Sequence, residues 1–247
     1  MLPRKSRHGV LVLSLCLLAA CDAPRPRPRP FHIPAPVPHA LPAPAYVSRQ
    51  AWHADDTHAR TPPVYTGPVE IVFVHHTNQP NGYDCVRDVP AILRSIEVHH
   101  IDDEGWDDIG YNFAVDHCGT IYEGRAGGAT QPVRGAHTRG FNAHSVGIAA
   151  IGTFGAGQPV PRPMIEAIAA IAAWKLPENV SPLGTVRLVA SSNGGRYAKG
   201  ATVDLNVISG HRDGDSTDCP GQALYDALPE IRAYAAQLRQ DIDRPPR

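Results

Sequence analysis

The strongest constraint on the fold is a continuous apolar run at residues 71–74. Ile71-Val72-Phe73-Val74 offers no polar side chain to either face of a strand and is rich in β-branched residues. A strand that is apolar on both faces is typical of the buried centre of a sheet. His75 and His76 follow directly, so two imidazoles are expected at the end of this strand.

Helix-like segments alternate with further strand-like segments after this run. Apolar residues from Val89 to Ile96, and His100 with them, have the spacing of one helical face, and Asp88 is the expected N-cap. The remaining expected strands are short and lie at 112–115, 120–123 and 146–151.

Prolines mark the expected helices of the second half. Pro163 is expected to begin a helix that Pro177 ends, and Pro220 to begin a final helical region that Pro229 interrupts. Residues 184–200 are polar and rich in glycine, and no element is expected there. The alternation of strands and helices predicts an α/β domain around a central sheet.

The first 20 residues have the pattern of an export signal. Basic residues precede an uncharged apolar stretch at 9–20, which is shorter than the about 20 residues that a membrane-spanning helix needs. Leu18-Ala19-Ala20-Cys21 resembles the lipobox of bacterial lipoproteins. We therefore expect a signal peptide at 1–20 and an exported protein held at the membrane by a lipid on Cys21. The alternative is an ordinary secretory signal and a freely secreted protein.

Residues 21–46 are interpreted as a linker. Proline and arginine alternate from Pro24 to Pro30, and five further prolines follow before residue 45. Proline lacks a backbone donor and fixes φ, so this segment favours extended polyproline II. We expect it to hold a globular domain at 47–240 away from the membrane, with a short tail at 241–247.

Charge and cysteine content narrow the classes of function. The 247 residues include 23 basic and 24 acidic side chains, and this net charge of −1 lacks the basic excess of a nucleic-acid binder. The 13 histidines favour metal or acid–base chemistry. Cys85 and Cys118 can pair in an oxidising compartment, which leaves Cys219 over. Pairing of Cys85 with Cys219, or no pairing, stays open because connectivity depends on distance.

Three segments combine residue types that bind zinc. They are His75-His76-Thr77, Gly210-His211-Arg212-Asp213 and Thr217-Asp218-Cys219-Pro220-Gly221. Imidazole nitrogen and thiolate sulfur are zinc ligands, and a catalytic site has three protein ligands and an open fourth position. Taken singly, a histidine at a strand end is more often a hydrogen-bonded structural residue, and a cysteine more often a small apolar one.

Further motifs lie between these segments. Trp106-Asp107-Asp108-Ile109-Gly110-Tyr111-Asn112-Phe113, Ile121-Tyr122-Glu123-Gly124-Arg125 and Gly135-Ala136-His137-Thr138-Arg139-Gly140-Phe141-Asn142 occur in this order. With the histidine and cysteine segments they resemble the peptidoglycan recognition protein family, which is similar to the phage lysozyme-type (type 2) N-acetylmuramoyl-L-alanine amidases. The resemblance runs from about Val47 to Leu238. It implies a single domain with a central mixed β-sheet flanked by helices.

The resemblance implies a role for each matching residue of the site. It implies that Zn²⁺ is held by His75 rather than His76, together with His211 and Cys219. It implies that Tyr111 is catalytic, as a hydrogen-bond donor to the oxyanion that forms during amide hydrolysis.

Further positions follow from the same resemblance. The position two before the cysteine is lysine in phage enzymes and threonine in many recognition proteins, and here Thr217 is the second expected catalytic residue. A disulfide between Cys85 and Cys118 is also implied. The residues expected to line the substrate groove are His100, Trp106, Arg125, His137 and Asn142.

Simpler interpretations remain for three of these residues. Tyr111 can pack in the core with its hydroxyl satisfied, Arg125 can pair with Glu123 or another carboxylate, and His137 can be structural.

The activity implied is hydrolysis of the amide between MurNAc and L-alanine in peptidoglycan. The expected protein is a monomer whose partners are muramyl peptides and, through Cys21, a membrane. One alternative is a tethered protein that binds peptidoglycan without cutting it, although relatives of that kind have usually lost the cysteine ligand that this chain keeps. Another is a structural zinc domain, which normally has four ligands where three are visible here.

Overall fold

The apolar run at 71–74 lies in the interior of a five-stranded sheet. Strand β1 (Ile71–His76) lies between β4 (Ser145–Ala150) and β7 (Ile208–Gly210) and runs parallel to both. Strand β2 (Phe113–Val115) is parallel to β4, and β3 (Ile121–Glu123) is antiparallel to β2. The order β3-β2-β4-β1-β7 confirms the predicted mixed sheet.

Residues 41–240 are the part of the chain that this computed structural model describes. Four predictions therefore lie wholly or mostly outside the described residues: the signal peptide at 1–20, the lipid on Cys21, the linker at 21–46 and the tail at 241–247. None of the described helices is long and apolar enough to cross a membrane.

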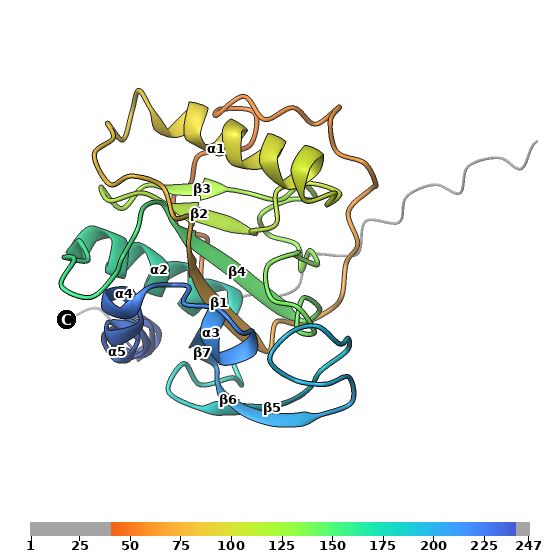
Figure 1. Cartoon of the computed structure of the whole chain (residues 1–247). Helices are drawn as coiled ribbons and strands as arrows, with labels where there is room; N and C mark the ends of the chain where they lie inside the picture. The colour runs from red at the N-terminus through yellow and green to blue at the C-terminus, as the bar shows by residue number, and fades with distance from the viewer. Residues whose placement is uncertain (1–40, 241–247) are drawn as a thin grey trace, which may run out of the picture. The chain divides into compact units, whose positions relative to one another are not determined.

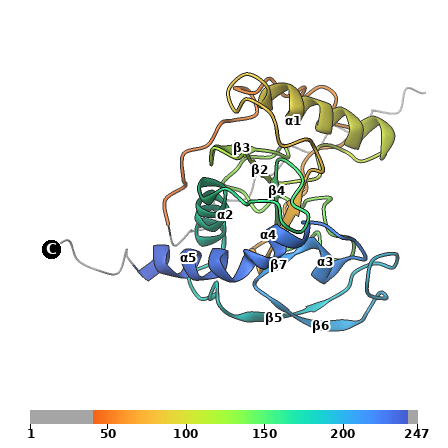
Figure 2. The same ribbon diagram turned by 60° about the vertical axis from the view of Figure 1, so that its left-hand side comes forward.

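Alternate residues of the strands face two different layers. Val72 of β1 and Phe113 of β2 share a core cluster with the apolar residues of α2 (Arg162–Lys175) and α5 (Leu228–Gln240). Ala114 of β2 packs instead in a second cluster with α1 (Val89–Val98). Figures 1 and 2 accordingly show α2 and α5 on one side of the sheet and α1 on the other.

The same alternation decides which histidine of β1 reaches which layer. His75 has the parity of Ile71 and Phe73, whose side chains pack in a third cluster away from α2. His76 has the parity of Val72, which faces α2. His75 is therefore directed away from α2, and it is completely buried.

Helix α1 ends earlier than the apolar spacing predicts. After Val98 the chain forms one π-helical turn, η1 (His99–Asp103), so His100 lies in this turn and not in the expected α-helix. Asp88 is the N-cap residue, as predicted, but its side chain makes no cap hydrogen bond. Its carboxylate accepts instead from the backbone N–H of Asp84, at 2.8 Å.

One strand lies inside the segment at 184–200, where no element is expected from the sequence, and a second strand follows it. Strands β5 (Thr185–Val189) and β6 (Thr202–Asn206) form a separate antiparallel pair. Val186 and Leu188 pack toward Ile71 and Phe73, while the other residues of β5 are exposed, so β5 has the period-2 pattern of a strand. The glycine-rich stretch that follows favoured a loop instead. We name residues 190–201, which join the two strands, the hairpin loop.

The C-terminal elements follow the prolines closely. The short helix α3 (His211–Gly214) begins at the end of β7, and α4 (Gln222–Asp226) begins two residues after Pro220. The break before α5 falls at Ala227, and Pro229 lies in the first turn of α5, where backbone N–H groups have no helical partner in any case.

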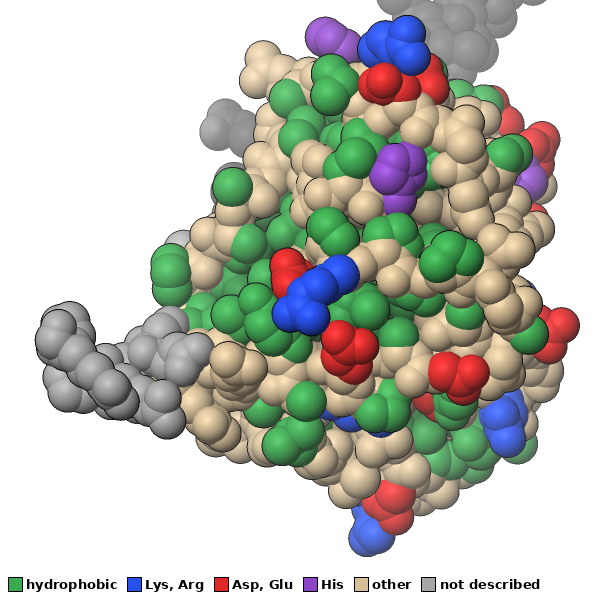
Figure 3. Space-filling view, turned by 90° about the vertical axis from the view of Figure 1, so that its left-hand side faces the viewer, with side chains coloured by type: hydrophobic (Ala, Val, Ile, Leu, Met, Phe, Trp, Pro, Cys, Tyr) green, Lys and Arg blue, Asp and Glu red, His purple; other side chains and the backbone are tan. Residues whose placement is uncertain are grey.

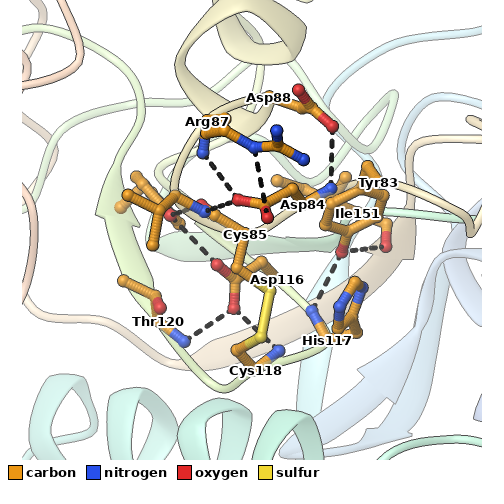
Figure 4. The surroundings of a disulfide bond; sticks show 12 residues. Tyr83, Asp84, Cys85, Arg87, Asp88, Asp116, His117, Cys118, Thr120 and Ile151 are labelled. Carbon is orange, nitrogen blue, oxygen red and sulfur yellow. Dashed lines mark hydrogen bonds and ion pairs between the residues drawn. A yellow bond between two sulfur atoms is a disulfide. The ribbon is translucent and has the colours of Figure 1, made fainter.

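A disulfide joins Cys85, ahead of α1, to Cys118, in the turn between β2 and β3 (Figure 4). It is the pairing that the resemblance implied, and Cys219 is free. The carboxylate of Asp116 accepts hydrogen bonds from the backbone N–H groups of Cys118 and Thr120, at 3.0 and 2.8 Å. The turn that carries Cys118 is thus held independently of the disulfide.

Charged side chains are sparse on the face that Figure 3 shows. Lysine and arginine side chains there are scattered, several of them near carboxylates, among hydrophobic and uncharged groups. The described part of this face therefore carries no continuous basic patch.

Candidate metal centre and active site

Parallel pairing of β1 with β7 brings together the two predicted histidine ligands. Val74 and Gly210 are partners in the sheet, so the next residues, His75 and His211, leave the two strands side by side. Their ring centroids are 4.4 Å apart. The sulfur of Cys219 lies 3.8 Å from Nδ1 of His75, and one ligand atom from each of the three residues lies within 4.8 Å of the others. The structure therefore brings together all three predicted ligands.

Backbone hydrogen bonds tie Cys219 to α3 and to the end of β1. The backbone N–H of Arg212 donates to the carbonyl oxygen of Cys219, at 2.9 Å, and the peptide bond from Cys219 to Pro220 is cis. The backbone N–H of His76 donates to the cysteine sulfur, at 3.3 Å. His76 thus contributes its backbone to the site, whereas its side chain is not one of the three clustered ligands.

Burial sets the protonation of the three ligands. It lowers the pKa of His75 well below the usual range, and it lowers the pKa of His211 to about 4 although the carboxylate of Asp215 opposes this. Both imidazoles are therefore neutral near pH 7 and have a lone pair to give. Burial raises the pKa of the Cys219 thiol to about 12, so a nearby cation is needed to form the thiolate.

Two buried nitrogen atoms at the site make no hydrogen bond within the described residues. They are Nε2 of His75 and Nε2 of His211, and the latter lies 3.7 Å from the carboxylate of Asp215. Two neutral imidazoles and one thiol match the three protein ligands of a catalytic zinc site in their chemistry. The residues present therefore fit the metal that the resemblance implied.

Tyr111 lies against this cluster. Its ring centroid is 5.2 Å from that of His75 and 5.3 Å from that of His100. Burial raises the pKa of the phenol, and the nearby Cys219 adds to this, so the hydroxyl keeps its proton. Among the described residues, this hydroxyl has no hydrogen-bond partner. The simpler interpretation, in which Tyr111 is a core residue with a satisfied hydroxyl, would require one.

Thr217 contacts the backbone of the cysteine loop. Its hydroxyl oxygen accepts a hydrogen bond from the backbone N–H of Cys219, at 3.2 Å. This contact stabilises the cysteine loop. A catalytic role for Thr217 stays a prediction.

Three hollows are lined by the five expected groove residues, and one of the hollows is also lined by the ligand His211. The largest, about 370 Å³, is lined by His100 and Tyr111 among others. A second, about 180 Å³, is lined by Trp106, His137, Asn142 and the ligand His211. A third, also about 180 Å³, shares Asn142 with the second and adds Arg125. Trp106, His137 and Asn142 thus share a hollow with a ligand, and the contacts of all five groove residues with substrate stay predictions.

Glycines give the aromatic groove residues their space. A Cβ on Gly147 of β4 would lie 2.4 Å from the ring of His137, and one on Gly110 would lie 2.6 Å from the ring of Trp106. Nδ1 of His100 accepts from the backbone N–H of Gly110, at 3.0 Å, so its Nε2 carries the proton. The sequence motifs do not explain why glycine occurs at 110 and 147. In the structure, an aromatic ring lies where a Cβ would be at each position.

Polar groups hold the remaining groove residues in place. Oδ1 of Asn142 accepts from the backbone N–H groups of His137 and Thr138, at 2.7 and 2.8 Å. Burial lowers the pKa of His137 to about 3, so its ring is neutral. Arg125 donates to the carbonyl oxygens of Asp108 and Ile109, at 3.4 and 3.2 Å, so it supports the segment that leads to Tyr111.

A buried ionic network that the sequence motifs do not predict lies behind the groove. The guanidinium of Arg49 lies 2.8 Å from Glu97 and 3.4 Å from Asp108, and all three side chains are buried. Asp108 also accepts from the backbone N–H groups of Ile109 and Ala126, at 2.6 and 2.8 Å. The network therefore fixes the loop before Tyr111, and only its place beside the Trp106–Phe113 motif hinted at this.

Known proteins share this sequence and geometry. The model of a family described as N-acetylmuramoyl-L-alanine amidase matches residues 65–222. The human N-acetylmuramoyl-L-alanine amidase is 34% identical over 201 residues, which cover 81% of this chain but 30% of that protein. Peptidoglycan-recognition protein SC2 of Drosophila simulans is 27% identical over 193 residues, covering 76% of this chain and 85% of that protein.

Solved structures agree with the sequence matches. Bumblebee PGRP-SA has a TM-score of 0.58 at 26% identity, covering 76% of this chain and 95% of that one. Human PGRP-IBETAC, solved in complex with glycosamyl muramyl pentapeptide, has a TM-score of 0.56 at 28% identity, covering 75% and 95%. The chain belongs to the family of peptidoglycan recognition proteins and type 2 N-acetylmuramoyl-L-alanine amidases.

Proposed function

We propose that this protein is a zinc-dependent N-acetylmuramoyl-L-alanine amidase, which hydrolyses the amide between MurNAc and L-alanine of peptidoglycan. The observation that carries the proposal is the cluster of His75, His211 and Cys219, with ligand atoms within 4.8 Å. Tyr111 lies next to it, and its hydroxyl has no hydrogen-bond partner among the described residues. A family that contains both amidases and recognition proteins supports the substrate class.

Zinc held by the three residues would supply a Lewis acid and a water molecule of lowered pKa. The chain's own part is to present two neutral imidazoles and one sulfur, and the His76 N–H favours the thiolate by donating to it. Tyr111 keeps its proton and is placed to donate it in a hydrogen bond to the scissile carbonyl oxygen as negative charge develops there.

The hollows beside the cluster suit a glycan with a peptide stem. Trp106 and His137 offer ring faces, and Arg125 and Asn142 offer donors at the third hollow. Such a mixture of ring faces and a few polar groups is typical of pockets that orient a ligand. The solved complex of human PGRP-IBETAC with a muramyl pentapeptide supports binding of this class of ligand.

We also propose that the enzyme acts outside the cytoplasm as a monomer, with residues 1–20 as a lipoprotein signal and Cys21 as the lipid anchor. The proline-rich stretch at 21–46 would then span the distance between the membrane and the wall. Labelling with a lipid precursor, lost in a Cys21→Ser protein, tests the anchor.

A binding protein without activity is the second candidate. The observation that favours it is Thr217, which supplies no cation and directs its hydroxyl to the Cys219 N–H. Zinc-loaded protein incubated with a muramyl peptide separates the two. New L-alanine amino termini that vanish with a chelator and return with zinc support the amidase. Binding of the peptide with zinc present and no release supports the recognition protein.

A further inference from the structure

The carboxylate of Asp215 lies beside the metal cluster. Oδ2 of Asp215 lies 3.7 Å from Nε2 of His211, the closest ion pair to any of the three ligands among the described residues. The two residues are four apart across the short helix α3, a spacing that places side chains on one face. Both side chains are about one-fifth exposed, at 21% and 19%.

Other carboxylates of the same loop are either engaged or turned outward. Asp213 accepts from the backbone N–H of Gly210, at 2.9 Å, and from the hydroxyl of Tyr225, at 2.7 Å. Asp218 is exposed. Asp215 Oδ1 accepts from the backbone N–H of Ser216, at 2.8 Å, which orients the carboxylate and leaves Oδ2 directed to His211.

The hairpin loop covers this pair. Arg139 donates to the carbonyl oxygen of Gly194, at 3.1 Å, and so ties the hairpin loop to the groove. A Cβ on Gly195 would lie 3.4 Å from Oδ1 of Asp215, so backbone of the hairpin loop lies directly against the carboxylate. Partial exclusion of water strengthens a hydrogen bond to an ionised acceptor.

We infer that Asp215 is a positioning residue for the metal centre: it accepts the Nε2–H of His211, fixes that tautomer and leaves Nδ1 as the zinc-binding atom. A metal-bound histidine commonly donates its second N–H to a carboxylate in this way. The present 3.7 Å needs to shorten by about 0.8 Å to reach a typical hydrogen bond. The inference rests on the zinc site of the proposed function but not on amide hydrolysis.

Zinc affinity, measured by competition with a chromophoric chelator in the absence of substrate, tests this role. Asp215→Ala is expected to weaken zinc binding by about 10- to 100-fold. Asp215→Asn keeps an acceptor oxygen but loses the charge, so an intermediate loss is expected. The matched control is Asp218→Asn, in the same loop and exposed, which should bind zinc as the parent protein does.

A second readout separates positioning from folding. The cobalt-substituted Asp215→Asn protein should show altered visible absorption bands, while its metal-free form unfolds at the parent temperature. Parent zinc affinity in Asp215→Ala would overturn the inference, as would an equal loss in Asp218→Asn. An effect on KM for muramyl peptide with zinc affinity unchanged would instead make Asp215 a substrate contact. Because affinity is measured without substrate, an inactive parent protein would defeat the proposed function and leave this result standing.

Discussion

Removal of the disulfide tests how much of the stability depends on the constraint that it places on the unfolded chain. Cys85 and Cys118 are 33 residues apart in sequence. In the chain-entropy model, closing a loop of that length removes about 13 cal/mol/K from the unfolded state, or about 4 kcal/mol at 25 °C. Backbone N–H groups of Cys118 and Thr120 donate to Asp116 and hold the turn without the disulfide, so the folded structure should survive.

The double variant Cys85→Ala/Cys118→Ala is therefore expected to lose about 4 kcal/mol and to melt about 8–15 °C lower. Urea unfolding should also show a larger m-value, because the uncrosslinked unfolded chain exposes more surface. Reductant provides the control: it should shift the parent protein toward the variant and leave the variant unchanged. A loss below about 1 kcal/mol with an unchanged m-value would refute the reasoning.

Three further predictions concern the site and the core. Tyr111→Phe should lower kcat by about 10²- to 10³-fold with zinc content unchanged, which steady-state kinetics and metal analysis would check; an unaltered kcat contradicts the donor role. Gly147→Ala places a Cβ 2.4 Å from the His137 ring and should cost about 1–3 kcal/mol in urea unfolding, whereas parent stability would mean that the ring moves freely. Burial lowers the pKa of Lys175 from 10.5 to about 7. Between pH 7 and 10.5 the unfolded chain therefore binds more protons than the folded protein, so the free energy of unfolding should rise with pH. The rise, measured relative to Lys175→Met, should be at most about 5 kcal/mol. Equal pH profiles for the two proteins would show that Lys175 stays charged in the fold.

The parts of the fold that the sequence predicts well are those with strong local signals. The run at 71–74 is apolar on both faces, and only the interior of a sheet accommodates this. The π turn at 99–103 was missed because α- and π-helical turns differ by a single residue, which apolar spacing does not resolve. Strand β5 was missed because the glycine-rich stretch after it is a stronger signal than the five alternating residues of the strand.

The candidate site, like the fold, has residues that the sequence predicts and residues that it does not. The family motifs pointed to His75, His211 and Cys219, and pairing of β1 with β7 explains physically why the first two meet. The parity of β1 explains why His75 and not His76 is directed to the cluster. Asp215 carries no signal in sequence, because its role depends on a distance that only the fold creates.

The central claim is that a zinc site built from His75, His211 and Cys219 cuts the bond between the lactyl group and L-alanine. Its most direct test is mass spectrometry of a defined muramyl peptide digested by the zinc-loaded protein in ¹⁸O-labelled water. Hydrolysis of that amide places one ¹⁸O atom in the lactyl carboxylate and leaves the released peptide unlabelled with a free alanine amine. An intact substrate after prolonged incubation, or label in any other fragment, would contradict the claim.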